Sequence, residues 1–384
     1  MYISKPQFPA LVPKQVPEEV TAEDKAIFAH ITDVSLTPEQ ERQLCSPQQV
    51  YPDQGEVLAV HWHPEFVPVS LAVKRMQSMF PHRKQELIIP TQHNVLLSHA
   101  GYSGVEVDCY SQRFNQKVQL LLHFPQHKVE QAGILRSMLT HTRQYRASQL
   151  ADLMRSFTQP VPERLDAAAR KTGADKDLIR FISLYVRKLE ALVEEHGHEL
   201  SVDMVKNKIV RNFFHALRPV YGHQLIDRAQ NFLHVVKQAV KEAFPLQYFF
   251  RTSEFIEEAR GVGGGVVVPH PEQFWPILLA DYDVDGYEVW NPQSRRYTDF
   301  LISVVTSKNE ERLRGHRPIL IFMGDDTHMG EKLREKDEAD PAKKDREVGY
   351  QPAWEDWAVR KRLLRNSMSR AVIISEYTAR LQTR

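Results

Sequence analysis

The sequence predicts an α/β fold in which a β/α barrel of about seven strands carries a helical insertion. Short apolar runs of strand length occur in two blocks of the chain, and a long stretch with helical periodicity separates the blocks. In the second block the apolar runs alternate with helical patterns. Such alternation favours parallel strands joined by right-handed crossovers, which is how β/α barrels are built.

The first block, residues 55–127, holds apolar runs that are rich in Val, Leu and Ile and are bounded by polar residues or Pro. Runs of this kind are typical of buried strands in a parallel sheet. They are Val57–Val60, Glu86–Ile89, Ser103–Val107 and Val118–Leu122. Residues 1–54 are rich in Pro, Gln and Glu, and we expect them to form an N-terminal extension with one short helix.

Residues 128–258 follow a different period. Apolar residues recur three and four positions apart in Ala167–His196, Met204–Ala216 and Gln230–Ala243. This spacing places the apolar side chains on one face of an amphipathic helix. The stretch therefore predicts an inserted helical domain.

Strand signals return in residues 259–332, which form the second block. Helical patterns at Glu272–Ala280 and Tyr297–Leu313 separate the strand candidates Val266–Val268, Gly286–Val289 and Pro318–Phe322. Strands separated in this way are expected to pair in parallel. Residues 333–384 are expected to form a charged linker and a C-terminal helical tail.

Composition bounds the partners and the compartment. Lys and Arg total 50 against 49 Asp and Glu, so the net charge of +1 gives no global reason to expect nucleic acid or an anionic membrane as the main partner. The two cysteines, Cys45 and Cys109, form no disulfide framework and no CxxC pair, which favours a cytoplasmic protein. The longest apolar runs, such as Ile319–Met323, fall far below the roughly 20 residues that span a bilayer.

Histidines and carboxylates follow or lie within the predicted strands. The candidates are His61, His63, His93, Glu106, His270, Asp326 and His328. His61 and His63 stand two apart in an extended segment, so both imidazoles point to one side and can reach one ion. Barrel active sites lie at the carboxyl ends of several strands, and a mixture of imidazole and carboxylate suits Zn, Mn or Fe. No thiolate takes part, which argues against a structural zinc cluster.

The order of these motifs resembles the polymerase-and-histidinol-phosphatase (PHP) family of metal-dependent phosphoesterases. His61-Trp62-His63 resembles the family's opening HxH motif, and Thr91-Gln92-His93-Asn94 resembles its T-D-H motif. Gly104–Val107 resembles the strand that carries the bridging glutamate, Gly264–Pro271 the G-G-x-x-x-x-H-P motif, and Gly324–His328 the closing G-S-D-x-H motif. The resemblance covers residues 55–127 and 256–332, and family members with a helical insertion between these blocks are known.

The resemblance implies a distorted (β/α)7 barrel that hydrolyses a phosphate ester with a metal-activated water. It implies one to three divalent ions per chain, held by the seven residues named above, with Glu106 bridging and with Glu106, Asp326 and His328 at the catalytic centre. Asp325 is expected to be a ligand or to orient one. Phosphate favours the forked donors of arginine, and the candidates are Arg113 and Arg295. The expected substrate is a small phosphorylated molecule or a short oligonucleotide, and the oligomeric state is not predicted.

Two positions depart from the family's pattern. Gln92 stands where the family has an aspartate, and Gln119 stands near the place of a histidine. These losses would empty one or two metal sites unless His99 or His123 replaces a ligand. Two alternatives therefore stay open. A degenerate barrel would bind a metal or ligand without hydrolysis, and an amidohydrolase-type enzyme would need a bridging lysine on a middle strand, where this chain has Glu106.

Overall fold

The computed structural model describes residues 12–13, 16–200, 204, 208–312, 317–334 and 341–383. The chain divides into two compact units. The first contains the described parts of Met1–Ser35 and Gln144–Pro245, and the second contains the described parts of Leu36–Arg143 and Leu246–Arg384. Among the described residues, no helix combines the length and the apolar character that crossing a membrane requires.

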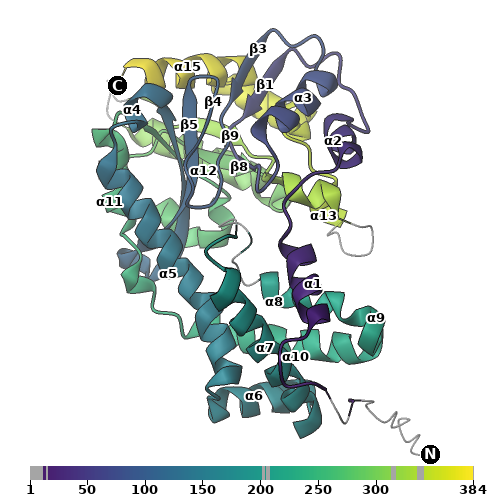
Figure 1. Ribbon diagram of the computed structural model, residues 1–384. Coiled ribbons are helices and arrows are strands. Elements are labelled where there is room, and N and C mark those ends of the chain that lie inside the picture. The colour runs from purple at the N-terminus through teal and green to yellow at the C-terminus, as the bar shows by residue number, and fades with distance from the viewer. Residues whose placement is uncertain are drawn as a thin grey trace, which may run out of the picture. The chain divides into compact units, whose positions relative to one another are not determined.

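The second unit contains the strands, in three sheets (Figure 1). Two sheets are parallel pairs: β1 (Glu56–Ala59) with β3 (Gln85–Ile88), and β2 (Trp62–His63) with β10 (Thr327–His328). The third sheet has six strands in the order β4-β5-β6-β7-β8-β9. Their bounds are Leu97–His99, Tyr102–Ser111, Gln116–Pro125, Gly265–Val268, Gly286–Trp290 and Leu320–Met323.

Main-chain hydrogen bonds join these sheets to one another. The Ile89 amide donates to the Ala59 carbonyl at 2.8 Å, which continues the pairing of β1 with β3. A parallel bridge between His93 and Glu106 links the end of β3 to β5. The Asp326 amide donates to the His61 carbonyl at 3.0 Å, beside the β10–β2 pair. The segments that carry the predicted ligands are therefore hydrogen-bonded neighbours.

The expectation of parallel strands throughout the first block is wrong for two of the predicted runs. Ser103–Val107 and Val118–Leu122 lie in β5 and β6, which form an antiparallel hairpin, and β6 is also antiparallel to β7. The connection between β5 and β6 is a short turn, η1 (Gln112–Phe114), followed by Asn115 in the left-handed region at φ 49°. So short a connection cannot hold a crossover helix, and only antiparallel strands can follow from it. By contrast, β7, β8 and β9 pair in parallel.

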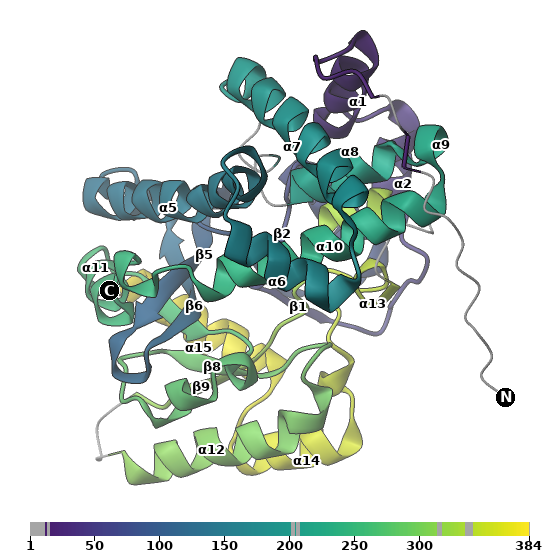
Figure 2. The same ribbon diagram turned by 90° about the horizontal axis from the view of Figure 1, so that it is seen from below.

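Helices pack against these strands. They are α2 (Pro38–Cys45), α3 (Val69–Met79), α4 (Gln126–Val129), α11 (Thr252–Gly261), α12 (Thr298–Glu311), α13 (Pro341–Lys344), α14 (Trp357–Arg365) and α15 (Arg370–Thr383). Helices α12 and α14 lie side by side (Figure 2). The predicted helix at Glu272–Ala280 is instead a 3₁₀ segment, η3 (Pro271–Leu279), because Phe274 leaves the helical region and Pro276 removes a donor.

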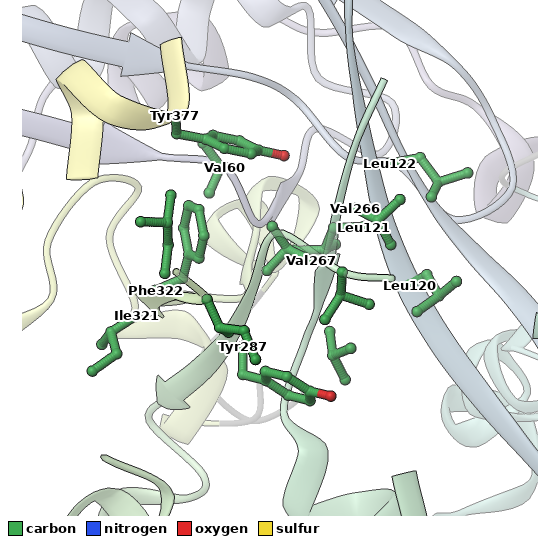
Figure 3. Packing of buried hydrophobic residues seen from close by; sticks show 14 of the residues in the cluster. Val60, Leu120, Leu121, Leu122, Val266, Val267, Tyr287, Ile321, Phe322 and Tyr377 are labelled. Atoms are coloured by element: carbon green, nitrogen blue, oxygen red, sulfur yellow. The ribbon is translucent and has the colours of Figure 1, made fainter. Parts of the chain in front are cut away.

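The C-terminal residues belong to the core of the second unit. Ile373, Ile374, Tyr377 and Leu381 of α15 are buried in the same apolar cluster as the sheet. The rings of Tyr377 and Phe322 meet edge to face with their centroids 5.0 Å apart (Figure 3). The predicted division into a barrel and a separate C-terminal tail is thus not the division that the structure shows.

The first unit is helical. Its helices are α1 (Ala22–Thr32), the later part of α5 (Gly133–Thr158), α6 (Pro162–Thr172), α7 (Lys176–His196), α8 (Lys208–Ala216), α9 (Arg218–Tyr221) and α10 (His223–Glu242). Part of the predicted helix Met204–Ala216 lies outside the described residues. Helix α1 packs with the insertion rather than standing apart as an extension, since Lys188 Nζ donates to Asp24 Oδ2 at 2.7 Å between two buried side chains. The apolar stripes of α7, α8 and α10 pack into one apolar cluster, which explains why this stretch forms its own core.

Candidate metal centre

Histidines and carboxylates from distant parts of the sequence form three overlapping groups in the second unit. In each group the ligand atoms lie within 4.8 Å of one another. The groups are His63, His93 and His328; His61, Glu106 and His270; and His61, His63 and Asp326. All seven side chains that the sequence singled out as metal ligands occur in these groups.

Local structure explains how these side chains converge. His61 follows the short strand β1, and His63 lies within the short strand β2. Glu106 lies in the middle of β5. His270 follows β7, and Asp326 lies between β9 and β10. His270 has a φ of 27° and Asp326 has a φ of 47°, a region that residues other than Gly seldom adopt. Such backbone conformations cluster at functional sites, where the surrounding structure holds them in place.

The carboxylates lie between the imidazoles. Asp326 Oδ1 is 3.6 Å from His61 Nε2, 3.4 Å from His63 Nε2 and 3.6 Å from His328 Nε2. Glu106 Oε1 is 3.8 Å from His61 Nε2 and 3.5 Å from His270 Nε2, and Glu106 Oε2 is 3.6 Å from His63 Nε2. Most of these separations exceed good hydrogen-bond length. They suit atoms that share a bound cation between them.

The buried nitrogens of the groups fit a metal. Within the part of the chain that the structure describes, His61 Nε2 and both ring nitrogens of His63 are buried and have no hydrogen-bond partner. A buried polar atom without a partner costs free energy, and a coordinated ion removes that cost. The donor set of imidazole nitrogen and carboxylate oxygen suits Zn, Mn or Fe.

Electrostatics in the groups favours a positive charge. Burial lowers the pKa of His61, but the carboxylates of Glu288, Asp326 and Glu106 overcome this effect and raise the pKa to about 10. Burial opposes ionisation of Glu106, yet the neighbouring histidines hold its pKa well below the usual range. Burial, with the charges of His93 and His328, lowers the pKa of His63 to about 3, so its ring is in the neutral form that binds metals.

Glu288 of β8 orients two of the candidate ligands, and sequence reasoning assigned it no role. His61 Nδ1 lies 2.6 Å from Glu288 Oε1, and the backbone amide of His270 donates to Glu288 Oε2 at 2.9 Å. Because the carboxylate accepts from Nδ1, a metal ion that displaces the proton on Nε2 would meet the Nε2 lone pair, which faces the groups. Gly324 makes this approach feasible, since a Cβ at that position would stand 2.0 Å from Glu288 Oε1.

Asp326 is also held from outside the groups. Its Oδ2 accepts from Arg346 Nη1 at 2.8 Å and from Gln293 Nε2 at 2.9 Å, and Arg346 also donates to the Asp326 carbonyl at 2.9 Å. One carboxylate oxygen is thus fixed by donors while Oδ1 faces three histidines. Neither Arg346 nor Gln293 carried a signal in the sequence, because one lies in a charged stretch and the other in a loop.

The two departures from the family's pattern have structural surroundings of their own. The Gln92 side-chain oxygen accepts from the Glu65 amide at 3.1 Å, and Gln119 is paired with Asp108 across the β5–β6 hairpin. No group among the described residues includes His99, which is half-buried on β4, or His123. The expectation that one of these histidines replaces a missing ligand therefore finds no support.

His123 instead fastens β6 to its neighbours. His123 Nε2 lies 2.9 Å from the Val60 carbonyl and Nδ1 lies 2.8 Å from the Tyr377 hydroxyl. A carbonyl only accepts, so Nε2 carries the proton and the Tyr377 hydroxyl donates to Nδ1. Burial lowers the pKa of His123 to about 4, while Val60 acts in the opposite direction.

This depressed pKa predicts an acid-sensitive stability. The unfolded chain binds the proton of His123 below about pH 6.5 and the folded chain only near pH 4, so the stability falls as the pH falls through this window. The loss that this group causes reaches about 2 kcal/mol at pH 5. Urea unfolding at pH 7.5 and pH 5 should show that His123→Gln loses less stability than the wild type. An equal loss in both proteins would contradict the assignment.

The remaining predicted residues, Arg113, Arg295 and Asp325, differ in their surroundings. Strand β5 runs on to Ser111, five residues or about 17 Å beyond Glu106, and the exposed Arg113 lies in the turn after it. The structure therefore does not bring Arg113 to the groups. Arg295 is exposed and lies over the Trp290 ring, 5.9 Å from its centroid. Asp325 belongs to none of the groups, and its buried carboxylate accepts from the amides of Thr327 and Gly349.

Comparisons with known proteins identify no family. No family model matches the chain, and no curated protein matches it. A solved structure from Bifidobacterium adolescentis ATCC 15703, described as a "putative metal-dependent phosphoesterase", is 16% identical. The match covers 82% of this chain and 98% of that chain with a TM-score of 0.42. A likeness this distant assigns no function to the chain.

Proposed function

We propose that the chain is a metal-dependent phosphoesterase whose second unit is a distorted (β/α)7 barrel of the PHP type. The observation that carries the proposal is the convergence of His61, Glu106, His270 and Asp326, which stand far apart in the sequence, on overlapping groups of ligand atoms. The order of the motifs along the sequence supports the PHP assignment. Overlapping groups that share His61 and His63 suit neighbouring ions, and one to three Zn, Mn or Fe ions would be held there.

Bound divalent ions neutralise phosphoryl oxygens and lower the pKa of a coordinated water to near neutrality. The residues of the chain contribute the rest. Glu106 and Asp326 supply negative charge between the imidazoles, and Glu288 and Arg346 hold His61 and Asp326 in place. The substrate that we propose is a small phosphorylated molecule or a short oligonucleotide.

The experiment measures metal content and turnover on the same preparation. Protein loaded with Mn²⁺ or Zn²⁺ is expected to hydrolyse p-nitrophenyl phosphate or its bis ester, to lose activity with EDTA, and to regain it with added metal. Full metal occupancy without turnover on a broad panel of phosphate esters would favour a degenerate barrel that binds a metal or ligand without hydrolysis. Gln92 and Gln119 are the sequence features that favour this alternative. Turnover of a lactone or an amide, without turnover of phosphate esters, would favour an amidohydrolase-type enzyme.

A further inference from the structure

Three exposed or half-exposed aromatic rings gather on the segments that follow β7 and β8. They are Trp275 in η3, Tyr297 at the end of η4 (Arg295–Tyr297) and Phe300 in the first turn of α12. The Trp275 ring lies 5.0 Å from the Tyr297 ring and 5.5 Å from the Phe300 ring, at interplanar angles of 88° and 73°. We call these three residues the aromatic platform.

The platform keeps aromatic surface open to solvent. Trp275 is 39% exposed and Phe300 is 53% exposed, although large aromatic side chains gain most from burial. The neighbouring rings meet edge to face rather than in a parallel stack, and the solvent-exposed parts of Trp275 and Phe300 are the surface that a further planar group can reach. A cluster of exposed aromatic surface of this kind marks a binding site more often than scattered single residues do.

The platform lies at the same end of the sheet as the candidate ligands. Segment η3 begins directly after His270, and η4 follows Gln293, whose amide donates to Asp326. Strands β7 and β8 are parallel neighbours, so the loops after them emerge at one end of the sheet. In barrels this is the end at which substrates bind.

Positive charge accompanies the rings. The Arg296 guanidinium lies 4.6 Å from the Tyr297 ring centroid, and Arg295 lies over Trp290 at the end of β8. The nearby carboxylate of Asp299 lies 3.5 Å from Arg362, which offsets its charge. Aromatic faces together with arginines are the groups that bind nucleobases and their phosphates with little sequence preference.

We propose that the aromatic platform binds the base of a nucleotide substrate whose phosphate lies at the metal centre. This proposal rests on the proposed phosphoesterase function and names its substrate class. The base stacks on Trp275 or Phe300, and the arginines face the charged part of the nucleotide. The platform therefore selects nucleotides over phosphorylated molecules that lack a planar ring.

The test compares AMP with ribose 5-phosphate, which carry the phosphate on the same sugar and differ by the base. In the wild type kcat/KM for AMP should exceed that for ribose 5-phosphate. Trp275→Ala and Phe300→Ala should each lower this ratio about tenfold by acting on AMP alone. Trp275→Phe, which keeps a ring, should restore most of the loss. Leu279→Ala, an exposed apolar change in the same η3 segment, should alter neither substrate.

An unchanged ratio in both alanine variants overturns the proposal, as does an equal loss on both substrates, which would show damage to the centre instead. Equilibrium dialysis separates this proposal from the phosphoesterase assignment. If the wild type hydrolyses neither compound, the phosphoesterase assignment fails. The platform is still supported in that case if the wild type binds AMP more tightly than ribose 5-phosphate and Trp275→Ala loses this preference. Equal binding of the two compounds to the wild type overturns the platform.

Discussion

Replacing Glu106 with Gln should remove at least one metal ion per chain and abolish any hydrolysis. Glu106 places one oxygen near His61 and His270 and the other near His63 and His93. Its negative charge therefore lies beside the histidines of two of the three groups. A neutral amide keeps the shape but loses the charge and turns an N–H toward histidine nitrogens. Since a catalytic metal contributes several kcal/mol of transition-state stabilisation, hydrolysis should fall about 10³-fold or more. Metal analysis after gel filtration and initial rates on p-nitrophenyl phosphate measure both effects.

The matched control is Glu86→Gln, which makes the same chemical change at an exposed position on β3. It should leave metal content and rate at wild-type values. His196→Ala, in the helical unit, should also leave both unchanged, because His196 belongs to none of the groups found among the described residues. Wild-type metal content and rate in Glu106→Gln, with a normal melting temperature, would show that the centre is assigned to the wrong residues.

The seven candidate ligands were predictable because their signal is local. Each stands at or within a short apolar run, and the end of a strand is where parallel sheets gather functional side chains. His61 and His63 were predictable from their spacing alone, because residues two positions apart in an extended segment point to the same side. The structure places these side chains in groups without any change to the predicted set.

The hairpin and the outer contacts were not predictable for physical reasons. Both faces of β5 and β6 are buried, so these strands show the continuous apolar pattern that also marks parallel strands. The short turn with Asn115 was the available signal, and missing it placed Arg113 too close to the centre. Arg346 reaches Asp326 across 20 residues, and a contact of that kind leaves no periodic pattern in one sequence.

Helices α1 and α15 show a second limit of periodicity. Periodicity shows that a helix has an apolar face, but it does not show which core receives that face. Asp24 finds its partner in Lys188, and Tyr377 finds His123 and Phe322. The predicted division into extension, barrel, insertion and tail follows composition along the chain, whereas the units follow these contacts.

Glu288 should prove nearly as important for metal binding as the ligands themselves. Its carboxylate accepts from His61 Nδ1 and from the His270 amide, so Glu288→Gln removes a charge and turns a donor toward one of these two donors. Loss of a carboxylate that orients a metal-bound histidine typically lowers metal affinity about 10–100-fold. Competition of the protein with a fluorescent chelator for Zn²⁺ should show a loss of this size.

Gly324→Ala tests the same contact without touching the carboxylate. The new Cβ would stand 2.0 Å from Glu288 Oε1, so the side chain of Glu288 has to move away from His61. Zinc affinity should fall in the same direction as in Glu288→Gln. Gly55→Ala adds a Cβ where no atom lies within 4 Å, and it should bind zinc like the wild type. If Glu288→Gln and Gly324→Ala both keep the wild-type affinity for zinc, Glu288 does not orient His61. Its carboxylate would then only hold the backbone at His270.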